Sequence, residues 1–255
     1  MMGLFDLKGK IALVTGASAG LGVQFAKALA GQGADLAIMA RRWEKLEEVR
    51  KIIEALGARC FAVKCDVLNV DDIKAAIAKI KEHYGRIDIL VNNAGVARAM
   101  PAESQPDDDW KAVIDTNLNS VYFVARAVGQ VMIEQNYGKI INLGSIHSSV
   151  AMPNRPLNAY CASKGGVLML TKALASEWAK YNITVNAIGP AYFPSEMTSA
   201  AMSLPAFLDV VKTYCPMGRP GREGELDGAL IYFASDASSY TTGQLLSIDG
   251  GWTAI

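Results

Sequence analysis

Short apolar runs alternate with amphipathic segments along the whole chain. Several of these runs predict strands, and each is a continuous apolar stretch rather than an alternation of apolar and polar residues. A strand without a polar face is typical of a parallel sheet that is covered on both sides. The predicted strands are Ile11–Thr15, Leu36–Ala40, Cys60–Lys64, Ile87–Val91, Lys139–Leu143, Ile183–Ile188 and Gln244–Ile248.

Helical periodicity fills the intervals between these runs. The predicted helices are Gly20–Gly33, Trp43–Leu56, Val70–Tyr84, Ala159–Tyr181 and Glu223–Ser235, with two more helices within Asp107–Asn136. Because crossovers between parallel strands are right-handed, this order predicts an α/β fold with a doubly wound parallel sheet in three layers, α/β/α. Ligands bind such sheets beyond the carboxyl ends of the strands, so residues directly after strands are the candidates for chemistry.

Composition excludes several classes of function. The 255 residues include 25 Lys and Arg and 25 Asp and Glu, and this zero net charge argues against nucleic-acid binding. Hydrophobic residues make up 51%, too many for a disordered chain. No apolar run reaches the roughly 18 residues of a membrane span, and Asp6 and Lys8 do not fit a signal peptide. We therefore expect a cytoplasmic protein that binds neither nucleic acid nor a membrane.

The cysteines and histidines do not form a metal-binding pattern. The chain has four Cys and two His, without a CxxC pair and without the spacing of a zinc site. We therefore expect no metal site, and the chemistry has to come from side chains and an organic cofactor. The positions are Cys60, Cys65, Cys161, Cys215, His83 and His147.

A glycine-rich turn follows the first predicted strand and opens the first predicted helix. Gly16 permits a tight turn, Gly20 lets the backbone approach a pyrophosphate, and Gly22 lets the helix pack closely on the sheet. The free N–H groups and the positive dipole at the helix amino end favour a phosphate. In this context the TGxxxGxG spacing predicts a dinucleotide site rather than an ordinary turn, although it differs from the common GxGxxG.

The residues after the second predicted strand indicate NADP(H). An NAD site usually has an acid there to hold the ribose 2′-hydroxyl, but this strand ends in Ala40 and is followed by Arg41 and Arg42. The nearest acid, Asp35, stands at the other end of the strand. Two guanidinium groups suit a 2′-phosphate, and the alternative is that both are solvated charges at a helix start.

A second group of residues is suited to proton transfer. Tyr160 and Lys164 are one helical turn apart, Ser145 directly follows the fifth predicted strand and its glycine, and Asn117 is a polar residue within a predicted helix. Free Tyr has a pKa near 10, which is high for a base, and we expect the nearby ammonium and the positive charge of an oxidised nicotinamide to lower it. Tyr160 can then exchange a proton with an alcohol or ketone while Ser145 donates a hydrogen bond to its oxygen.

Together these residues resemble the short-chain dehydrogenase/reductase family over nearly the whole chain. The residues that match are Thr15-Gly16, Gly20, Gly22, Asp66-Val67, Asn92-Asn93-Ala94-Gly95, Asn117, Ser145, Tyr160, Lys164, Asn186, Pro190 and Asp249-Gly250-Gly251. The resemblance implies one Rossmann-type domain over residues 1–255, a homotetramer, and catalysis by Asn117, Ser145, Tyr160 and Lys164. Within the family, Asn158–Pro190 is most similar to gluconate 5-dehydrogenase-type members.

The resemblance also implies roles for individual residues. Asp66 should meet the adenine amino group, Lys164 should hold the nicotinamide ribose, and Asn117 should support a water that links Lys164 to solvent. The full set expected to bind NADP(H) is Gly16, Ser18, Gly20, Leu21, Gly22, Arg41, Arg42, Asp66, Val67, Asn93, Ala94, Gly95, Tyr160, Lys164, Pro190, Phe193 and Ser195. The chain departs from the family in having Ala19 before Gly20 and in placing Ser145 and Tyr160 15 positions apart.

The substrate is left open by these patterns. A lid over about residues 192–219 is expected, and its apolar side chains suit an acyl chain, a steroid or another apolar ketone. A sugar acid or polyol needs fixed polar groups, for which His147, Asn154 and Arg155 are the candidates, and Arg155 can pair with a carboxylate. We therefore expect an NADP(H)-dependent oxidoreductase that interconverts a secondary alcohol and a ketone. The alternative from another class is a cofactor-binding regulator without turnover.

Overall fold

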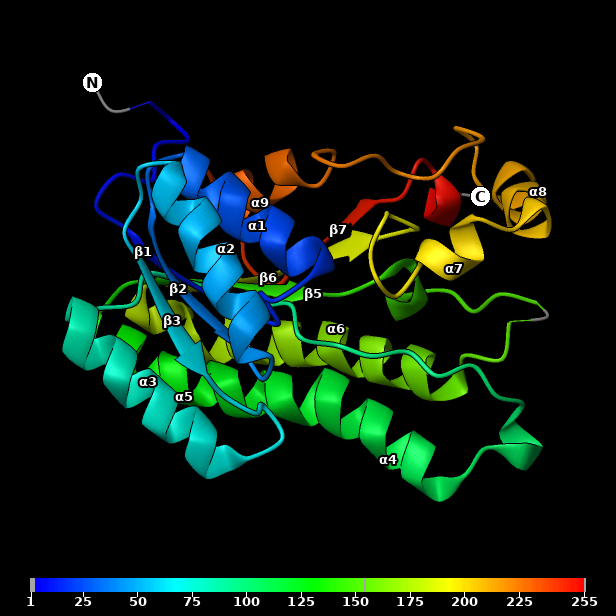
Figure 1. The fold of residues 1–255 in the computed structure, drawn as a ribbon, viewed down its shortest axis with the longest axis horizontal. Helices are drawn as coiled ribbons and strands as arrows, with labels where there is room; N and C mark the ends of the chain where they lie inside the picture. The colour runs from blue at the N-terminus through cyan, green and yellow to red at the C-terminus, as the bar shows by residue number, and fades with distance from the viewer. Residues whose placement is uncertain (1–2, 154, 255) are drawn as a thin grey trace.

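Seven parallel strands form the centre of the molecule, in the order β3-β2-β1-β4-β5-β6-β7 (Figure 1). The computed structural model describes residues 3–153 and 155–254; Asn154 lies outside them. The strands are β1 (Ile11–Thr15), β2 (Asp35–Ala40), β3 (Cys60–Lys64), β4 (Ile89–Asn92), β5 (Gly138–Leu143), β6 (Ile183–Pro190) and β7 (Leu245–Ile248). The order reverses between β1 and β4, so the chain is doubly wound as predicted.

Helices cover both faces of the sheet, which confirms the predicted three-layer arrangement (Figure 1). One face packs against α1 (Gly20–Gly31), α2 (Trp43–Ala55) and α9 (Asp227–Ala234). The other packs against α3 (Val70–Tyr84), α5 (Ser120–Gln135) and α6 (Asn158–Trp178), with α4 (Asp107–Ile114) beside α6.

Continuous burial explains why the central strands of the sheet are largely apolar. Every residue of β1 and of β6 is buried. The core on one face includes Phe25 of α1 and Phe233 of α9, and the core on the other includes Val128 of α5 and Trp178 of α6. Burial of this apolar area, at about 25 cal/mol per Å², is the main favourable term that holds the layers together.

The two predicted helices within Asp107–Asn136 are joined by a π-helical turn, η2 (Asp115–Asn119), which periodicity does not predict. The predicted helix Ala159–Tyr181 tightens into the 3₁₀ turn η4 (Ala179–Tyr181) after Trp178. π-helical turns are rare and occur mainly at functional sites, and Asn117 lies within this one.

Several other boundaries differ from the prediction by one to four residues, and two of these differences have identifiable reasons. The last long helix begins at Asp227 rather than Glu223, because Glu225 accepts hydrogen bonds from the Arg219 guanidinium and from the Arg222 backbone and holds a turn there. β4 begins at Ile89 rather than Ile87, because the buried Asp88 side chain accepts the Ile11 N–H at 2.9 Å.

A chain of buried polar side chains crosses the centre of the sheet. The Asn92 amide donates to Asn142 at 2.9 Å, and the Asn142 amide donates to the Thr171 hydroxyl at 2.9 Å. Since an unpaired buried amide is costly, these pairs specify the register of β4, β5 and α6. They lie just below the strand ends where the site is built.

The segment after β6 folds over the end of the sheet, and we call residues 192–219 the lid. It contains α7 (Ser199–Met202) and α8 (Pro205–Tyr214), neither of which was predicted. The lid packs as a small apolar cluster in which Phe207 and Val211 meet Met152 and the carboxyl-terminal Trp252. Among the described residues, no helix has both the length and the apolar character that a membrane span requires.

Candidate active site

A cleft of about 540 Å³ opens beyond the carboxyl ends of β1 and β4. This is the switch point of the sheet, where doubly wound folds bind their ligands. Its volume lies within the roughly 300–1,000 Å³ typical of small-molecule sites. The predicted residues that line it are Gly16, Ser18, Gly20, Leu21, Arg41, Arg42, Asp66, Val67, Asn93, Ala94, Gly95, Ser145, Tyr160, Lys164, Pro190, Phe193 and Ser195.

The glycine turn leaves room that no other residue would leave. Gly16 and Gly20 have φ values of +65° and +55°, which side chains disfavour. A Cβ atom on Gly16 would lie 2.9 Å from Cα of Ala94, and one on Gly22 would lie 2.4 Å from the Gly16 carbonyl oxygen. The turn therefore presents bare backbone at the start of α1, the arrangement that accommodates a pyrophosphate. Gly22 lies behind the cleft and shapes it rather than lining it.

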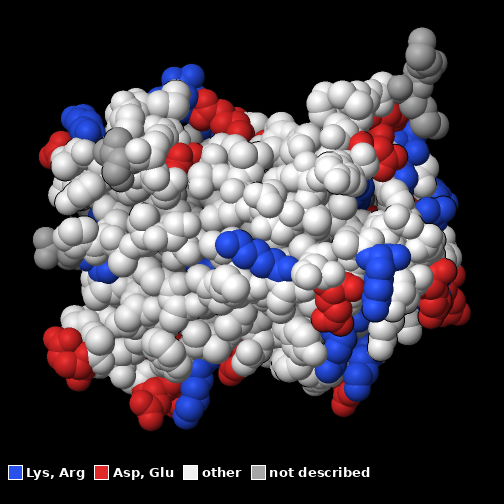
Figure 2. All heavy atoms as spheres, turned by 180° about the vertical axis from the view of Figure 1, so that it is seen from behind, with Lys and Arg blue, Asp and Glu red and all other residues white. Residues whose placement is uncertain are grey.

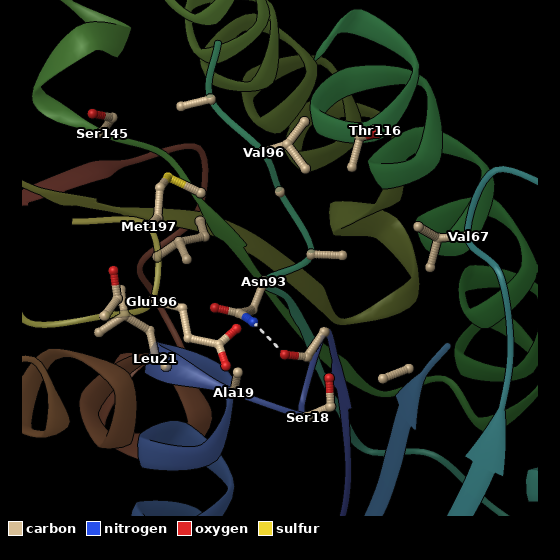
Figure 3. A pocket seen from close by; sticks show the side chains of 18 of the residues that line it. Ser18, Ala19, Leu21, Val67, Asn93, Val96, Thr116, Ser145, Glu196 and Met197 are labelled. Atoms are coloured by element: carbon tan, nitrogen blue, oxygen red, sulfur yellow. Dashed lines mark hydrogen bonds between the residues drawn. The ribbon is translucent and has the colours of Figure 1, made fainter. Parts of the chain in front are cut away.

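Thr15 and Asn93 fix the glycine turn to the end of β4. The Thr15 hydroxyl accepts hydrogen bonds from the backbone N–H groups of Asn93 and Ala94 at 3.0 and 3.1 Å. The Asn93 amide donates to the carbonyls of Thr15 and Gly16 at 3.0 and 3.2 Å, the latter drawn in Figure 3. These hydrogen bonds hold the two walls of the cleft at a fixed spacing.

Arg42 and Ser18 meet where the second strand reaches the cleft. The Arg42 Nε donates to the Ser18 hydroxyl at 3.2 Å, and Arg42 also pairs with Glu196 of the lid. Arg41 lies 3.9 Å from the Asp66 carboxylate. Asp35, by contrast, pairs with Arg59 at the far end of β2. Arg41 and Arg42 therefore lie at the cleft, whereas Asp35 does not. Two guanidinium groups at this place fit a cofactor with a 2′-phosphate.

Ser145, Tyr160 and Lys164 converge on the opposite side of the cleft. Ser145 follows β5 and begins the 3₁₀ turn η3 (Ile146–Ser148), whose backbone N–H at His147 donates to the Ser145 hydroxyl at 3.1 Å. Tyr160 lies in the first turn of α6, and Lys164 follows one turn later. The Lys164 Nζ lies 5.6 Å from the Tyr160 ring centroid and donates to the Leu143 carbonyl at 2.6 Å.

The ionisation of Tyr160 differs from the expectation. Burial raises the pKa of Tyr160 to about 12, and the interaction with the Ser145 hydroxyl opposes this rise only in part. Burial also lowers the pKa of Lys164 to about 8. Burial disfavours the charged form of both groups and outweighs the expected effect of the Lys164 ammonium. The prediction also relied on the positive charge of an oxidised nicotinamide, and that part stays a prediction. At neutral pH the phenol is protonated, which is the state that donates a proton.

Asn117 lies outside the cleft but directly behind it. Its amide nitrogen donates to the Val96 carbonyl at 2.9 Å and to the Ser163 hydroxyl at 3.1 Å, and its amide oxygen accepts the Val96 N–H at 2.8 Å. The side chain thereby joins the π-helical turn to α6 and to the segment after β4. Its part in a water relay stays a prediction, whereas its part in positioning these segments is direct.

Two features of the site were missed by the sequence patterns. Glu196 and Lys45 form a charged cluster with Arg42, and Thr116, Met197 and Thr198 also line the cleft. Glu196 is a single charged residue in the lid, so only its position after Ser195 could have drawn attention to it. Among the described residues, no group of three or more His, Cys, Asp or Glu is arranged to hold a metal ion.

A glycine turn at the switch point of a parallel sheet, with a protonated phenol and an amine across the same cleft, defines a dinucleotide-dependent oxidoreductase. The chain belongs to the short-chain dehydrogenase/reductase family. Residues 16–253 match the family model described as Enoyl-(Acyl carrier protein) reductase.

Several dehydrogenases and reductases resemble the chain over nearly its whole length. It is 40% identical over 250 residues to a gluconate 5-dehydrogenase of Gluconobacter oxydans, covering 98% of this chain and 97% of that protein. It is 38% identical to a 5-keto-D-gluconate 5-reductase of Escherichia coli, with 98% of each chain covered. A solved gluconate 5-dehydrogenase of Burkholderia cenocepacia, in complex with NADP and tartrate, has 39% identity and a TM-score of 0.95, covering 99% of this chain and 98% of that one.

Proposed function

We propose that this protein is an NADP(H)-dependent oxidoreductase that interconverts a secondary alcohol and a ketone in a sugar acid or polyol, such as gluconate and 5-ketogluconate. The observation that carries the proposal is that Ser145, Tyr160 and Lys164 line the same cleft as the glycine turn. Names of similar proteins, gluconate 5-dehydrogenase and 5-keto-D-gluconate 5-reductase, support the substrate class.

Tyr160, Ser145 and Lys164 have separate roles in the proposed reaction. When bound, NADP(H) supplies or accepts the hydride. The Tyr160 hydroxyl donates a proton to the ketone oxygen during reduction, and its phenolate accepts that proton during alcohol oxidation. Ser145 hydrogen-bonds the same oxygen as its charge changes. Lys164, held by the Leu143 carbonyl, supplies the nearby positive charge when it is protonated and orients the first turns of α6.

The lid side of the site offers polar groups for an acidic, hydroxylated substrate. The Arg155 guanidinium lies 5.6 Å from the Phe207 ring centroid, and no carboxylate among the described residues forms an ion pair with it. The His147 ring lies 5.9 Å from Tyr160. The His147 Nδ1 contacts the Val150 carbonyl, and because a carbonyl can only accept, Nδ1 carries the hydrogen. Nε2 is then the acceptor of the neutral ring. This buried atom has no hydrogen-bond partner among the described groups.

A specific observation favours a second candidate. The lid cluster around Phe207, Val211 and Trp252 is apolar, which suits a 3-oxoacyl, steroid or other apolar ketone. Such a substrate offers no carboxylate to the Arg155 guanidinium and few hydroxyl groups to the His147 acceptor. We therefore rank the sugar acid first and the apolar ketone second.

Measuring NADPH oxidation with a panel of ketones tests the proposal. We expect the highest kcat/KM with 5-ketogluconate or a related sugar acid, and lower values with 3-oxoacyl esters, steroids and aryl ketones. A clear preference for an apolar ketone would move the second candidate to first place. Failure of the wild-type protein to turn over any ketone while binding NADPH would instead support a regulator without turnover.

The variant Arg155→Met is expected to raise KM for 5-ketogluconate by about 10- to 100-fold, because a charge-assisted hydrogen bond contributes about 1.5–3 kcal/mol. The kcat should fall less than this, and KM for a neutral ketose should change little. Arg222→Met is the matched control, since Arg222 is exposed and its hydrogen bond to Glu225 comes from the backbone N–H. Equal losses with the acid and the neutral ketose would show that Arg155 does not bind a carboxylate.

We also propose a homotetramer in the cytoplasm, as the family resemblance implies. Figure 2 shows that uncharged atoms predominate on one face of the molecule, with a basic side chain across its middle and most other charged side chains nearer its margins. Trp110 of α4, Tyr122 of α5 and Met169 of α6 are exposed large side chains. These features support packing of one copy against another, since large apolar patches on a protein surface commonly mark interfaces.

A further inference from the structure

Glu196 extends from the lid to two cations beside the glycine turn. Its carboxylate accepts hydrogen bonds from both terminal nitrogens of Arg42, at 3.4 and 3.0 Å, and from the Lys45 Nζ at 2.9 Å. Arg42 immediately precedes α2 and Lys45 lies in its first turn. Figure 3 shows the Glu196 side chain pointing from the lid toward Ser18 and Ala19. The lid is thus attached to α2 across one end of the cleft.

The groups that hold Glu196 are those that bind a phosphate monoester. The Arg42 guanidinium presents two parallel donors to the carboxylate, a geometry that it offers equally to phosphate. Lys45 adds a compact charge, and the Ser18 hydroxyl, already hydrogen-bonded to Arg42 at 3.2 Å, adds another polar group. Arg42 also lines the cleft at the carboxyl end of β2, where a dinucleotide cleft of this fold ends. The Glu196 carboxylate therefore occupies an anion site.

The ion pairs of Glu196 hold its carboxylate in this site, but they are weak enough for another anion to displace it. The side chains of Arg42, Lys45 and Glu196 are 46%, 47% and 55% exposed, so water and salt screen the pairs. A second anion on the same two cations would be repelled by the carboxylate. A phosphate can enter only at the expense of these pairs, whereas a ligand without that phosphate leaves them in place.

We propose that Glu196 is an intramolecular competitor for the 2′-phosphate of NADP(H), and that it limits how strongly the site prefers NADP(H) to NAD(H). The inference rests on the proposed use of NADP(H). Binding of the 2′-phosphate releases the contact between the lid and α2. The neighbouring Ser195 remains against the glycine turn, where its Cβ lies 3.2 Å from the position that a Cβ of Gly20 would take. The lid thus keeps its contact with the glycine turn through Ser195 and loses its contact with α2 through Glu196.

The variant Glu196→Gln keeps the size of the side chain and removes its charge. We expect its Kd for NADPH to fall about three- to tenfold at low salt, in line with the loss of two exposed ion pairs, while the Kd for NADH stays within about twofold. Isothermal titration or cofactor fluorescence, without any substrate, gives both values. The fragments 2′,5′-ADP and 5′-AMP should repeat the difference, and 0.5 M salt should reduce it.

Two further variants make the test specific. Glu44→Gln removes an exposed charge from the first turn of α2 that forms no ion pair with another described residue, and it should leave both affinities unchanged. In an Arg42→Gln/Lys45→Gln background, Glu196→Gln should no longer strengthen NADPH binding.

An unchanged or weakened affinity of Glu196→Gln for NADPH would overturn the inference, because Glu196 would then be neutral or would orient Arg42 for the cofactor. An equal gain for NADPH and NADH would overturn it as well. Wild-type protein that binds NADPH but reduces no sugar acid would count against the proposed function alone, because the affinities are measured without substrate.

Discussion

Replacing Tyr160 by Phe is expected to reduce turnover by about 10³- to 10⁴-fold while the affinity for NADPH stays within about twofold of wild type. The substitution removes one hydroxyl from the first turn of α6 and keeps the ring against His147. The phenol contributes the proton that a ketone must receive, and no other described acid lies with Ser145 and Lys164 on this side of the cleft. Steady-state kinetics and a separate cofactor titration measure the two quantities.

The pH profile of the same enzyme provides a second readout. With the pKa of Tyr160 raised to about 12 by burial, the phenolate fraction grows about tenfold per pH unit below that value. Alcohol oxidation, which needs the base, should therefore accelerate as pH rises from 7 to 10, and ketone reduction should not. Residual oxidation by Tyr160→Phe should lose this dependence.

Tyr240→Phe is the matched control, since Tyr240 is fully exposed and should tolerate the loss of its hydroxyl. If Tyr160→Phe kept more than about a tenth of the wild-type kcat, another group would have to supply the proton. If wild-type protein itself were inert with every ketone, the regulator would be the better interpretation.

Much of the fold and of the cleft could be predicted because the signals are local. Apolar runs mark the buried strands, and the glycines at 16, 20 and 22 mark one turn within seven positions. Tyr160 and Lys164 are likewise joined by a single helical turn. Where parallel strands end is fixed by topology, so residues after different strands are gathered without any pairwise signal.

What could not be predicted depends on contacts between distant parts of the chain. Arg42 and Glu196 are 154 positions apart, and nothing in either local sequence links them. The raised pKa of Tyr160 is set by burial, which depends on what packs around α6 rather than on the spacing to Lys164. The π-helical turn at Asn117 follows from hydrogen bonds to Val96 and Ser163 that only the folded chain brings together.

The glycine turn also allows a strong prediction about the cofactor. The variant Gly22→Ala is expected to weaken NADPH binding by more than about 100-fold and to lower the free energy of unfolding by about 1–3 kcal/mol or more. The added Cβ would lie 2.4 Å from the Gly16 carbonyl oxygen and 2.6 Å from the Asn93 amide nitrogen. These atoms belong to the turn itself and to the side chain that clamps it to β4, so neither can move without opening the cleft.

Gly31→Ala is a matched control in the same helix. Gly31 is the last residue of α1, and a Cβ added there meets no atom within 4 Å. This variant should bind NADPH like wild type and be equally stable or more stable by up to about 1 kcal/mol, because Ala loses less conformational entropy in a helix than Gly. Thermal unfolding with and without NADPH compares the two variants. A Gly22→Ala protein with wild-type stability and NADPH affinity would show that the close approach of α1 to the turn does not shape the cofactor site.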